Sequence, residues 1–404
     1  MRRMLTLTTA ASLAAMLLVS PLFAAAEEQK LPVIMVTDVA GLGDQGFNDA
    51  AWAGVQRAAR EFALPVDIIQ SREQADYVPN LSAAAERADV VVSVGYIIAD
   101  AVRRVAPEYS DTFFVQIEGR IEDVPNVVSY DFKSQEAGFL GGIVAALYTK
   151  TGRVGAVTGM DIPPVEAYAA GYLSGIKAVE AATDREVEAT ILSAGTFDDP
   201  VKGRSLAENL VSRGCDVIFR IAGNTGVGVW EAVRAREDVK IIWEDIDRDS
   251  ESPGKVLAST LKRVDNAVFK GIKMAVDRRW EPGYDVLGYR EGGVGLSEME
   301  HTRDLFTEAE LAMIERAKGL LGRAEITVPE TRGEVADWRP PSLSEPEVGG
   351  GAAGSSAEGA AEGAAAAGGA AGASAEASRA GSGESAGQEK RPAAAGGEAG
   401  GSAG

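Results

Sequence analysis

The feature that most constrains this chain is the alternation of short, unbroken apolar runs with segments of helical periodicity. Runs such as 31–37 and 90–94 consist almost entirely of Val, Ile and other apolar residues. A strand without a polar face must be covered on both sides, as in a parallel sheet flanked by helices. The segments between the runs, such as 48–62 and 134–148, carry apolar residues at helical spacing. The pattern therefore predicts an α/β fold.

The alternation restarts at 153–157, and this restart predicts two lobes. The segment expected to be ordered, roughly 30–330, is longer than one core usually spans. We predict two doubly wound Rossmann-like lobes joined by crossover hinge strands near Tyr130, Asp245 and Tyr284. The predicted lobe boundaries are 30–129 plus about 246–283 for lobe 1, and 130–245 plus about 284–330 for lobe 2. Ligands of such sheets bind beyond the carboxyl ends of the strands.

The two ends of the sequence have their own signals. A basic start, an apolar run and the small residues Ala24 and Ala26 predict a signal peptide over 1–26. The single cysteine, Cys215, is far from this cleavage point, so we expect a soluble periplasmic protein without a lipid anchor. The segment 338–404, rich in Gly, Ala, Ser and Glu, is too poor in large apolar residues to form a core and is expected to be disordered.

Composition excludes several classes of function. One histidine, His301, and one cysteine leave little for a catalytic triad and too few ligands for a zinc site. A net charge of -20 argues against nucleic-acid binding, which needs a basic surface. We therefore expect no enzyme activity, no metal and no cofactor. An exported nicotinamide-dependent enzyme or a glycosidase remains the lower alternative. A ligand-responsive repressor is disfavoured, because the expected signal peptide occupies the place where such a protein carries its DNA-binding segment.

A glycine-rich loop, 41–46, follows the first strand and matches G-x-G-x-x-G. A dinucleotide site would have its glycines closer to the strand and an acidic residue after the second strand, where Gln70 stands instead. We interpret the loop as one that brings Asp38, Phe47 and Asn48 to a cleft. Asp38 can accept hydrogen bonds, Phe47 can stack on a flat ring, and Asn48 can donate and accept. The alternatives are that Asn48 or Asp44 caps the following helix and that Phe47 is a core residue at helical spacing.

Two later segments carry further candidate ligand contacts. The turn that begins at Ala222 is glycine-rich and follows a strand that contains Arg220. A buried Arg220 needs a partner, either a carboxylate of the protein or an acidic group on a ligand. Several carboxylates, among them Asp245, follow the next apolar strand and suit sugar hydroxyls. A tight turn and an exposed hinge are the respective structural alternatives.

In this order and spacing the motifs resemble a known family, the basic membrane protein (BMP) family of ABC-transporter solute-binding proteins, which includes PnrA-like purine nucleoside receptors. The resemblance covers nearly all of 31–330 and rests on these segments: 37–38, 44–48, 51–54, 125–129, 140–142, 151–155, 198–200, 222–228, 245–247, 262–265 and 292–296. It implies a type I periplasmic-binding-protein fold, with a nucleoside held between closing lobes. The implied partners are the ligand and ABC permease subunits, and the protein is expected to be a monomer.

The resemblance also implies residue roles. Phe47 stacks on the base while Asp38 and Asn48 bond it, Asp245 holds the ribose hydroxyls, and Lys262 donates to the ligand or clamps the cleft. Asp131, at the first crossover, is a weaker candidate. The chain departs from the family pattern at Glu118, Arg220 and the pair before Asp245. Arg220 in particular permits a more anionic ligand. A receptor of the same fold for a sugar, a carboxylate or a signalling molecule is the alternative.

Overall fold

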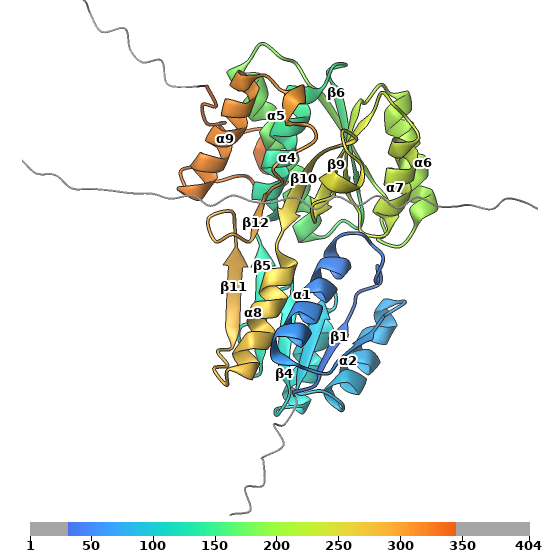
Figure 1. Ribbon diagram of the computed structural model, residues 1–404, viewed down its shortest axis with the longest axis vertical. Helices are drawn as coiled ribbons and strands as arrows, with labels where there is room; N and C mark the ends of the chain where they lie inside the picture. Colours follow the sequence, from blue (N-terminus) through green and yellow to red (C-terminus); the bar gives the residue numbers. More distant parts are fainter. Residues whose placement is uncertain (1–30, 345–404) are drawn as a thin grey trace, which may run out of the picture. The chain divides into compact units, whose positions relative to one another are not determined.

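The computed structural model describes residues 31–344. The predicted signal peptide over 1–26 and most of the predicted tail lie outside the described residues. Two sheets of six strands each divide the described chain into two lobes, lobe 1 below and lobe 2 above in Figure 1. None of the helices formed by residues 31–344 is both long and apolar enough to cross a bilayer.

The sheet of lobe 1 is parallel throughout and buried on both faces. Val33 and Met35 of the strand at 33–36 pack with one core cluster, and Ile34 and Val36 pack with another. This two-sided burial explains the unbroken apolar runs. The strand order is β11 (Gly283–Leu287), β5 (Val127–Phe132), β4 (Phe113–Ile117), β3 (Val90–Val94), β1 (Val33–Val36) and β2 (Val66–Ile69).

Helices cover both faces of this sheet. One pair packs together on one face, and a second pair covers the other. The first pair is α1 (Phe47–Phe62) and α8 (Val264–Val276), and the second is α2 (Tyr77–Ala85) and α3 (Ala99–Val105). Short 3-10 helices follow or precede these elements at η1 (Gln74–Asp76) and η2 (Ala106–Glu108).

The sheet of lobe 2 is parallel except for one edge strand, which runs antiparallel to its neighbour. Its strand order is β12 (Val294–Leu296), β10 (Val256–Lys262), β9 (Lys240–Asp245), β8 (Val217–Ile221), β6 (Arg153–Thr158) and β7 (Glu188–Ser193). The helices of this lobe are α4 (Ser134–Tyr148), α5 (Pro163–Ala182), α6 (Pro200–Ser212), α7 (Thr225–Arg234), α9 (Glu308–Gly322) and α10 (Arg332–Val335), with η3 (Asp249–Glu251) and η4 (Arg303–Leu305) between them.

Helices α4 and α5 approach each other closely through glycines. An added Cβ at Gly138 would lie 2.2 Å from the carbonyl oxygen of Tyr168, and one at Gly142 would lie 2.1 Å from that of Tyr172. Gly171 and Gly175 of α5 face α4 in the same way. Two four-residue glycine spacings therefore let the two backbones touch, and α4 as a result is buried along almost its whole length.

The chain crosses between the lobes three times: from β5 to α4, from β10 to α8, and from β11 to β12 (Figure 1). The predicted boundaries need correction. The predicted lobe 1 segment 246–283 contains β10, which pairs with β9 in lobe 2, whereas β11 belongs to lobe 1. Asp245 is likewise not at a crossing. Sequence periodicity identifies a strand but does not say which of two similar sheets it joins.

The start of the predicted tail also needs correction. Residues 338–344 pack on lobe 2 instead of being disordered. The indole of Trp338 meets the ring of Phe139 edge-on at 6.0 Å and donates to the carbonyl of Thr327, and Leu343 is buried in the core. These two side chains supply the apolar area that the following Gly/Ala-rich sequence lacks.

Candidate ligand-binding site

A cavity lies between the lobes, at the carboxyl ends of strands from both sheets. Phe47 of lobe 1 and Asp245 of lobe 2 both line it, which is the shared compartment that the sequence argument requires. About 70 Å³ of it is open to the centre of a water molecule. Since one water needs roughly 10–15 Å³ on this measure, the space suits a small molecule and not a chain segment.

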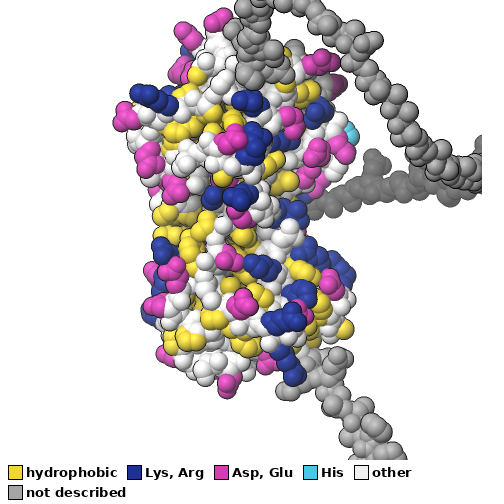
Figure 2. Space-filling model, turned by 90° about the vertical axis from the view of Figure 1, so that its left-hand side faces the viewer, with side chains coloured by type: hydrophobic (Ala, Val, Ile, Leu, Met, Phe, Trp, Pro, Cys, Tyr) yellow, Lys and Arg dark blue, Asp and Glu magenta, His cyan; other side chains and the backbone are white. Residues whose placement is uncertain are grey.

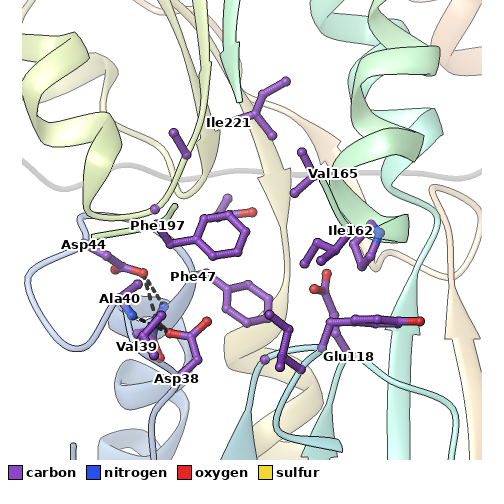
Figure 3. A pocket seen from close by; sticks show the side chains of 18 of the residues that line it. Asp38, Val39, Ala40, Asp44, Phe47, Glu118, Ile162, Val165, Phe197 and Ile221 are labelled. Atoms are coloured by element: carbon purple, nitrogen blue, oxygen red, sulfur yellow. Dashed lines mark hydrogen bonds between the residues drawn. The ribbon is translucent and has the colours of Figure 1, made fainter. Parts of the chain in front are cut away.

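Asp38, Asn48 and Asp44 form a hydrogen-bonded group on the lobe 1 wall. The Nδ2 of Asn48 donates to Oδ1 of Asp38 at 2.9 Å and to Oδ2 of Asp44 at 3.1 Å. The amide nitrogen of Asn48 is the donor in both bonds, and the carboxyl oxygens of Asp38 and Asp44 are the acceptors. The Oδ1 of Asn48 is then left buried without a partner. These bonds hold the group within lobe 1 and place the carboxylate of Asp38 in the cavity wall (Figure 3).

Aromatic side chains form the middle of the cavity. Figure 3 shows Phe47 and Phe197 one above the other, with Asp38 and Asp44 to one side and Glu118 and Ile162 to the other. Phe197 follows β7 in lobe 2, and Tyr168 comes from α5. Sequence reasoning missed both. Phe197 has the signal used elsewhere, an aromatic just beyond a strand, whereas Tyr168 sits at helical spacing and resembles a core residue.

An ion pair closes the end of the cavity near the crossovers. Nζ of Lys262, at the end of β10, lies 2.5 Å from Oε1 of Glu118, just after β4. Burial alone would lower the pKa of Lys262, but the carboxylates of Glu118 and Asp245 raise it. The lysine is therefore charged and already paired. Glu118 and Asp245 both adopt left-handed backbone, with φ of 62° and 72°, a strained geometry typical of functional sites.

Buried carboxylates dominate the electrostatics of the cavity. Burial raises the pKa of Asp38 to about 7, and the neighbouring Asp44 and Glu118 add to the rise while the bond from Asn48 opposes it. Burial likewise raises the pKa of Asp44, Glu244 and Asp245. Among residues 31–344, five carboxylates and one cation, Lys262, line the cavity. The site is therefore suited to donor-rich, uncharged ligands and unsuited to anions.

The comparison with known families agrees with this geometry. Residues 31–330 match the Bmp family, ABC transporter substrate-binding proteins that are PnrA-like. The chain belongs to the Bmp family. Its members are substrate-binding components of ABC transporters, and the match spans both lobes and every strand that lines the cavity.

Individual proteins similar to this Bmp-family chain support the fold. An uncharacterized lipoprotein of Pyrococcus horikoshii is 34% identical over 67% of this chain and 70% of its own. The ABC transporter nucleoside-binding protein BmpA of Lactococcus lactis subsp. cremoris is 29% identical over 74% of this chain and 89% of its own. A crystal structure of an ABC transporter solute-binding protein from Aeropyrum pernix K1 matches with a TM-score of 0.70 at 30% identity, covering 76% of this chain and 96% of that one. The type I periplasmic-binding-protein fold is confirmed.

Six of the eight predicted ligand contacts of this Bmp-family protein line the cavity, and two do not: the lining residues are Asp38, Phe47, Asn48, Ala222, Asp245 and Lys262. Asp131 lies outside the lining, where its carboxylate accepts from the backbone N–H of Gly119 and from the hydroxyl of Tyr284. It supports the turn after β4 instead of facing the ligand space. Within residues 31–344 no His, Cys, Asp and Glu side chains converge as metal ligands would.

Arg220 is the second correction. It is fully buried, and its Nη2 lies 3.3 Å from Oε1 of Glu244 in the same lobe. The partner that a buried cation needs is thus a carboxylate of the protein. The position was readable from the sequence, but the partner was not, because Glu244 comes from another strand.

The glycine-rich loop at 41–46 also has its donors in use. The backbone N–H of Leu42 donates to Gln70, those of Gly43 and Gln45 donate to Asp49, and that of Gly46 donates to Asp44. A phosphate cradle needs such N–H groups free. The loop is therefore held by the side chains of its own lobe and does not have the form of a dinucleotide site.

Proposed function

We propose that this protein captures an uncharged purine nucleoside in the inter-lobe cavity and presents it to an ABC permease, without chemical conversion. The observation that carries this proposal is the carboxylate of Asp38 beside the ring of Phe47 in the cavity wall (Figure 3). A purine offers ring and amino N–H groups to such acceptors and a flat face to the phenyl ring. BmpA of Lactococcus lactis, by its name a nucleoside-binding protein, supports the same ligand class.

Phe47 and Phe197 are the proposed stacking partners of the base, one from each lobe. Asp38, with its pKa raised to about 7, can either donate to a ring nitrogen or accept from an N–H. Asp245 accepts from the ribose hydroxyls, and Lys262, next to it, orients its carboxylate. Since the ligand contacts both lobes, it binds the closed state better and so drives closure.

The charge of the cavity argues against the rival ligands. An acidic ligand was the alternative suggested by Arg220, but that guanidinium is already paired with Glu244. Five lining carboxylates against Lys262 disfavour any added negative charge. A sugar remains compatible with the carboxylates but leaves the two phenyl rings with a smaller, less flat partner.

Ligand titration tests the proposal. Isothermal titration of the purified full chain with inosine, guanosine and adenosine is expected to show binding, whereas ribose and the corresponding 5′-monophosphates bind far more weakly. Ligand at about 100 times its Kd should also stabilise the protein by about 2.7 kcal/mol. Binding of a sugar or a nucleotide with no response to any nucleoside would contradict the assignment.

Export to the periplasm and delivery to permease subunits belong to the same proposal. The sequence of 1–26 and the family's transport role support them. The Pyrococcus relative is a lipoprotein, whereas the single cysteine here, Cys215, is buried before β8. We propose that the protein is free in the periplasm and, as the family resemblance implies, a monomer. Mass spectrometry of the exported protein, expected to start at Glu27 and to carry no lipid, tests this.

A further inference from the structure

The side chain of Arg220 donates hydrogen bonds to the other lobe. Arg220 lies in β8 of lobe 2 and its side chain is 0% exposed. Its Nη2 donates to the carbonyl of Asp44 at 2.9 Å, and its Nη1 donates to the carbonyl of Gln45 at 3.3 Å. Both carbonyls belong to the loop between β1 and α1 of lobe 1. A buried cation of one lobe is thus partly satisfied by the backbone of the other.

Trp243 binds the same segment of lobe 1. It lies on β9, next to β8, and its indole Nε1 donates to the carbonyl of Gln45 at 2.9 Å. The guanidinium of Arg220 stacks 4.3 Å above the Trp243 ring. Two adjacent strands of lobe 2 therefore direct three donor groups at two consecutive carbonyls of lobe 1.

Contacts within lobe 2 also hold the side chain of Arg220 in place. Glu244 lies 3.3 Å from Arg220, and the carbonyl of Gly223 accepts from its Nη2 at 2.9 Å. Gly226 makes the room, because a Cβ there would lie 2.3 Å from Nε of Arg220. One glycine of the turn after β8 is thus explained by the guanidinium and not by a ligand.

The contacted loop, between β1 and α1, leads directly to residues that line the ligand cavity. Gln45 has left-handed backbone, with φ of 55°, a conformation that non-glycine residues adopt only when their surroundings hold it. The carboxylate of Asp44 accepts from the backbone N–H of Asn48 at 2.8 Å. The contacts of Arg220 and Trp243 therefore bear on the residues that position Phe47 and Asn48.

We propose that Arg220 and Trp243 are positioning residues that latch lobe 2 onto the carbonyls of Asp44 and Gln45, so that the protein itself stabilises the closed arrangement of the lobes. The latch uses no ligand atom, so it goes beyond the proposed nucleoside. Its consequence is a ligand-free protein that already populates the closed form, with its binding wall formed in advance. A ligand then meets a smaller closure cost and leaves more slowly.

Arg248 provides a matched control. Its guanidinium also lies over the Trp243 ring, at 5.4 Å, but its ion-pair partner is Glu251 of its own lobe. It shares the charge and the stacking of Arg220 and lacks the contacts to lobe 1. Arg248→Met should therefore leave lobe closure unchanged.

Pulsed electron-electron distance measurement on the ligand-free full chain tests the latch. Spin labels at Asp100→Cys and Val201→Cys, both exposed and on different lobes, are placed in a Cys215→Ser background. Trp243→Phe removes one inter-lobe donor and keeps the ring; Arg220→Met with Glu244→Gln removes the cation without leaving its carboxylate charged. Each is expected to lower the closed-to-open ratio by about tenfold, the effect of losing a hydrogen bond with a buried or charged partner.

The possible results distinguish failure of the latch proposal from failure of the proposed ligand. Distance distributions that stay unchanged in both variants would overturn it, and so would an Arg248→Met variant that opens equally. Should the double variant fail to fold, Trp243→Phe alone decides in the same two ways. A latch that responds as expected in a protein that binds no nucleoside would overturn only the proposed function.

Discussion

Nζ of Lys262 lies 2.5 Å from Oε1 of Glu118, and the two residues come from different lobes. The pair neutralises Lys262, the one lysine that lines the cavity in the described part of the chain, and the two side chains are only 4% and 8% exposed. It therefore decides how the site responds to ligand charge. A site whose lysine is already paired has no cation to offer to a phosphate.

Removing that partner should relax the selection against anions. In Glu118→Gln the charge of Lys262 is shared only with Asp245, so the ratio of the Kd of inosine 5′-monophosphate to that of inosine should fall by roughly tenfold or more. Isothermal titration with both ligands measures this ratio. Glu122→Gln, in the same loop but paired with Arg120 at the surface, is the control and should leave the ratio unchanged. A ratio that does not change in Glu118→Gln would mean that the pair has no part in specificity.

The stacking role of Phe47 predicts a loss of affinity without a loss of fold. Phe47→Ala and Phe197→Ala should each weaken nucleoside binding by about 1–3 kcal/mol, as for other base–aromatic contacts. Phe62→Ala is the matched control, since Phe62 ends the helix that Phe47 begins and packs on Phe269, outside the cavity. It should lower stability and leave Kd unchanged. Equal affinity of both cavity variants and wild type would show that the rings do not hold the base.

The raised pKa of Asp38, about 7 against an ordinary value of 3.8, predicts a pH dependence of stability. Between these two values the folded protein keeps a proton that the unfolded chain has lost. The contribution of Asp38 is therefore full below about pH 4 and is lost as the pH rises through 7. Urea unfolding from pH 4 to 8 gives the free energy of unfolding of wild type and of Asp38→Asn. The stability of wild type relative to Asp38→Asn should fall as the pH rises. The opposite slope would mean that the carboxylate is charged in the folded state.

Close packing of α4 on α5 predicts a large effect from one methyl group. A Cβ at Gly142 would lie 2.1 Å from the carbonyl oxygen of Tyr172, so Gly142→Ala must push the two helices apart. We expect a loss of about 1–3 kcal/mol or more in the free energy of unfolding. Gly333→Ala in α10, where nothing lies within 4 Å, is the control and should be neutral or slightly stabilising. Urea unfolding distinguishes the two, and an equally stable Gly142→Ala would contradict the close contact.

Much of the fold was predictable because each strand carries its own local pattern. The run at 90–94 predicts β3 with its observed bounds, since burial on both faces favours apolar residues along almost the whole strand. Strand β8 follows the same pattern except for Arg220. The lobe membership of β10 and β11 was not predictable. Both lobes have the same architecture, so nothing local to a strand says which sheet it joins.

The residues of the candidate site likewise fall into those that the sequence predicted and those that it did not. Asp38, Phe47, Asp245 and Lys262 follow apolar strands, and position alone predicts that they line a cleft between the lobes. Arg220 and Asp131 are exceptions, because what a polar side chain bonds depends on strands far away in the sequence. Phe197 and Tyr168 were missed for the related reason that an aromatic residue looks the same in a core and in a cavity wall.

By itself, the sequence determined the type of fold, the family and most of the residues around the ligand space, because burial, periodicity and motif spacing are local properties. Only the tertiary structure decided which partners the buried charged side chains have. It paired Arg220 with Glu244 and two carbonyls of the other lobe, and Lys262 with Glu118 across the cavity. A buried charge is stable only beside its partner, and these partners lie on other strands or on the other lobe, so they meet only in the folded protein.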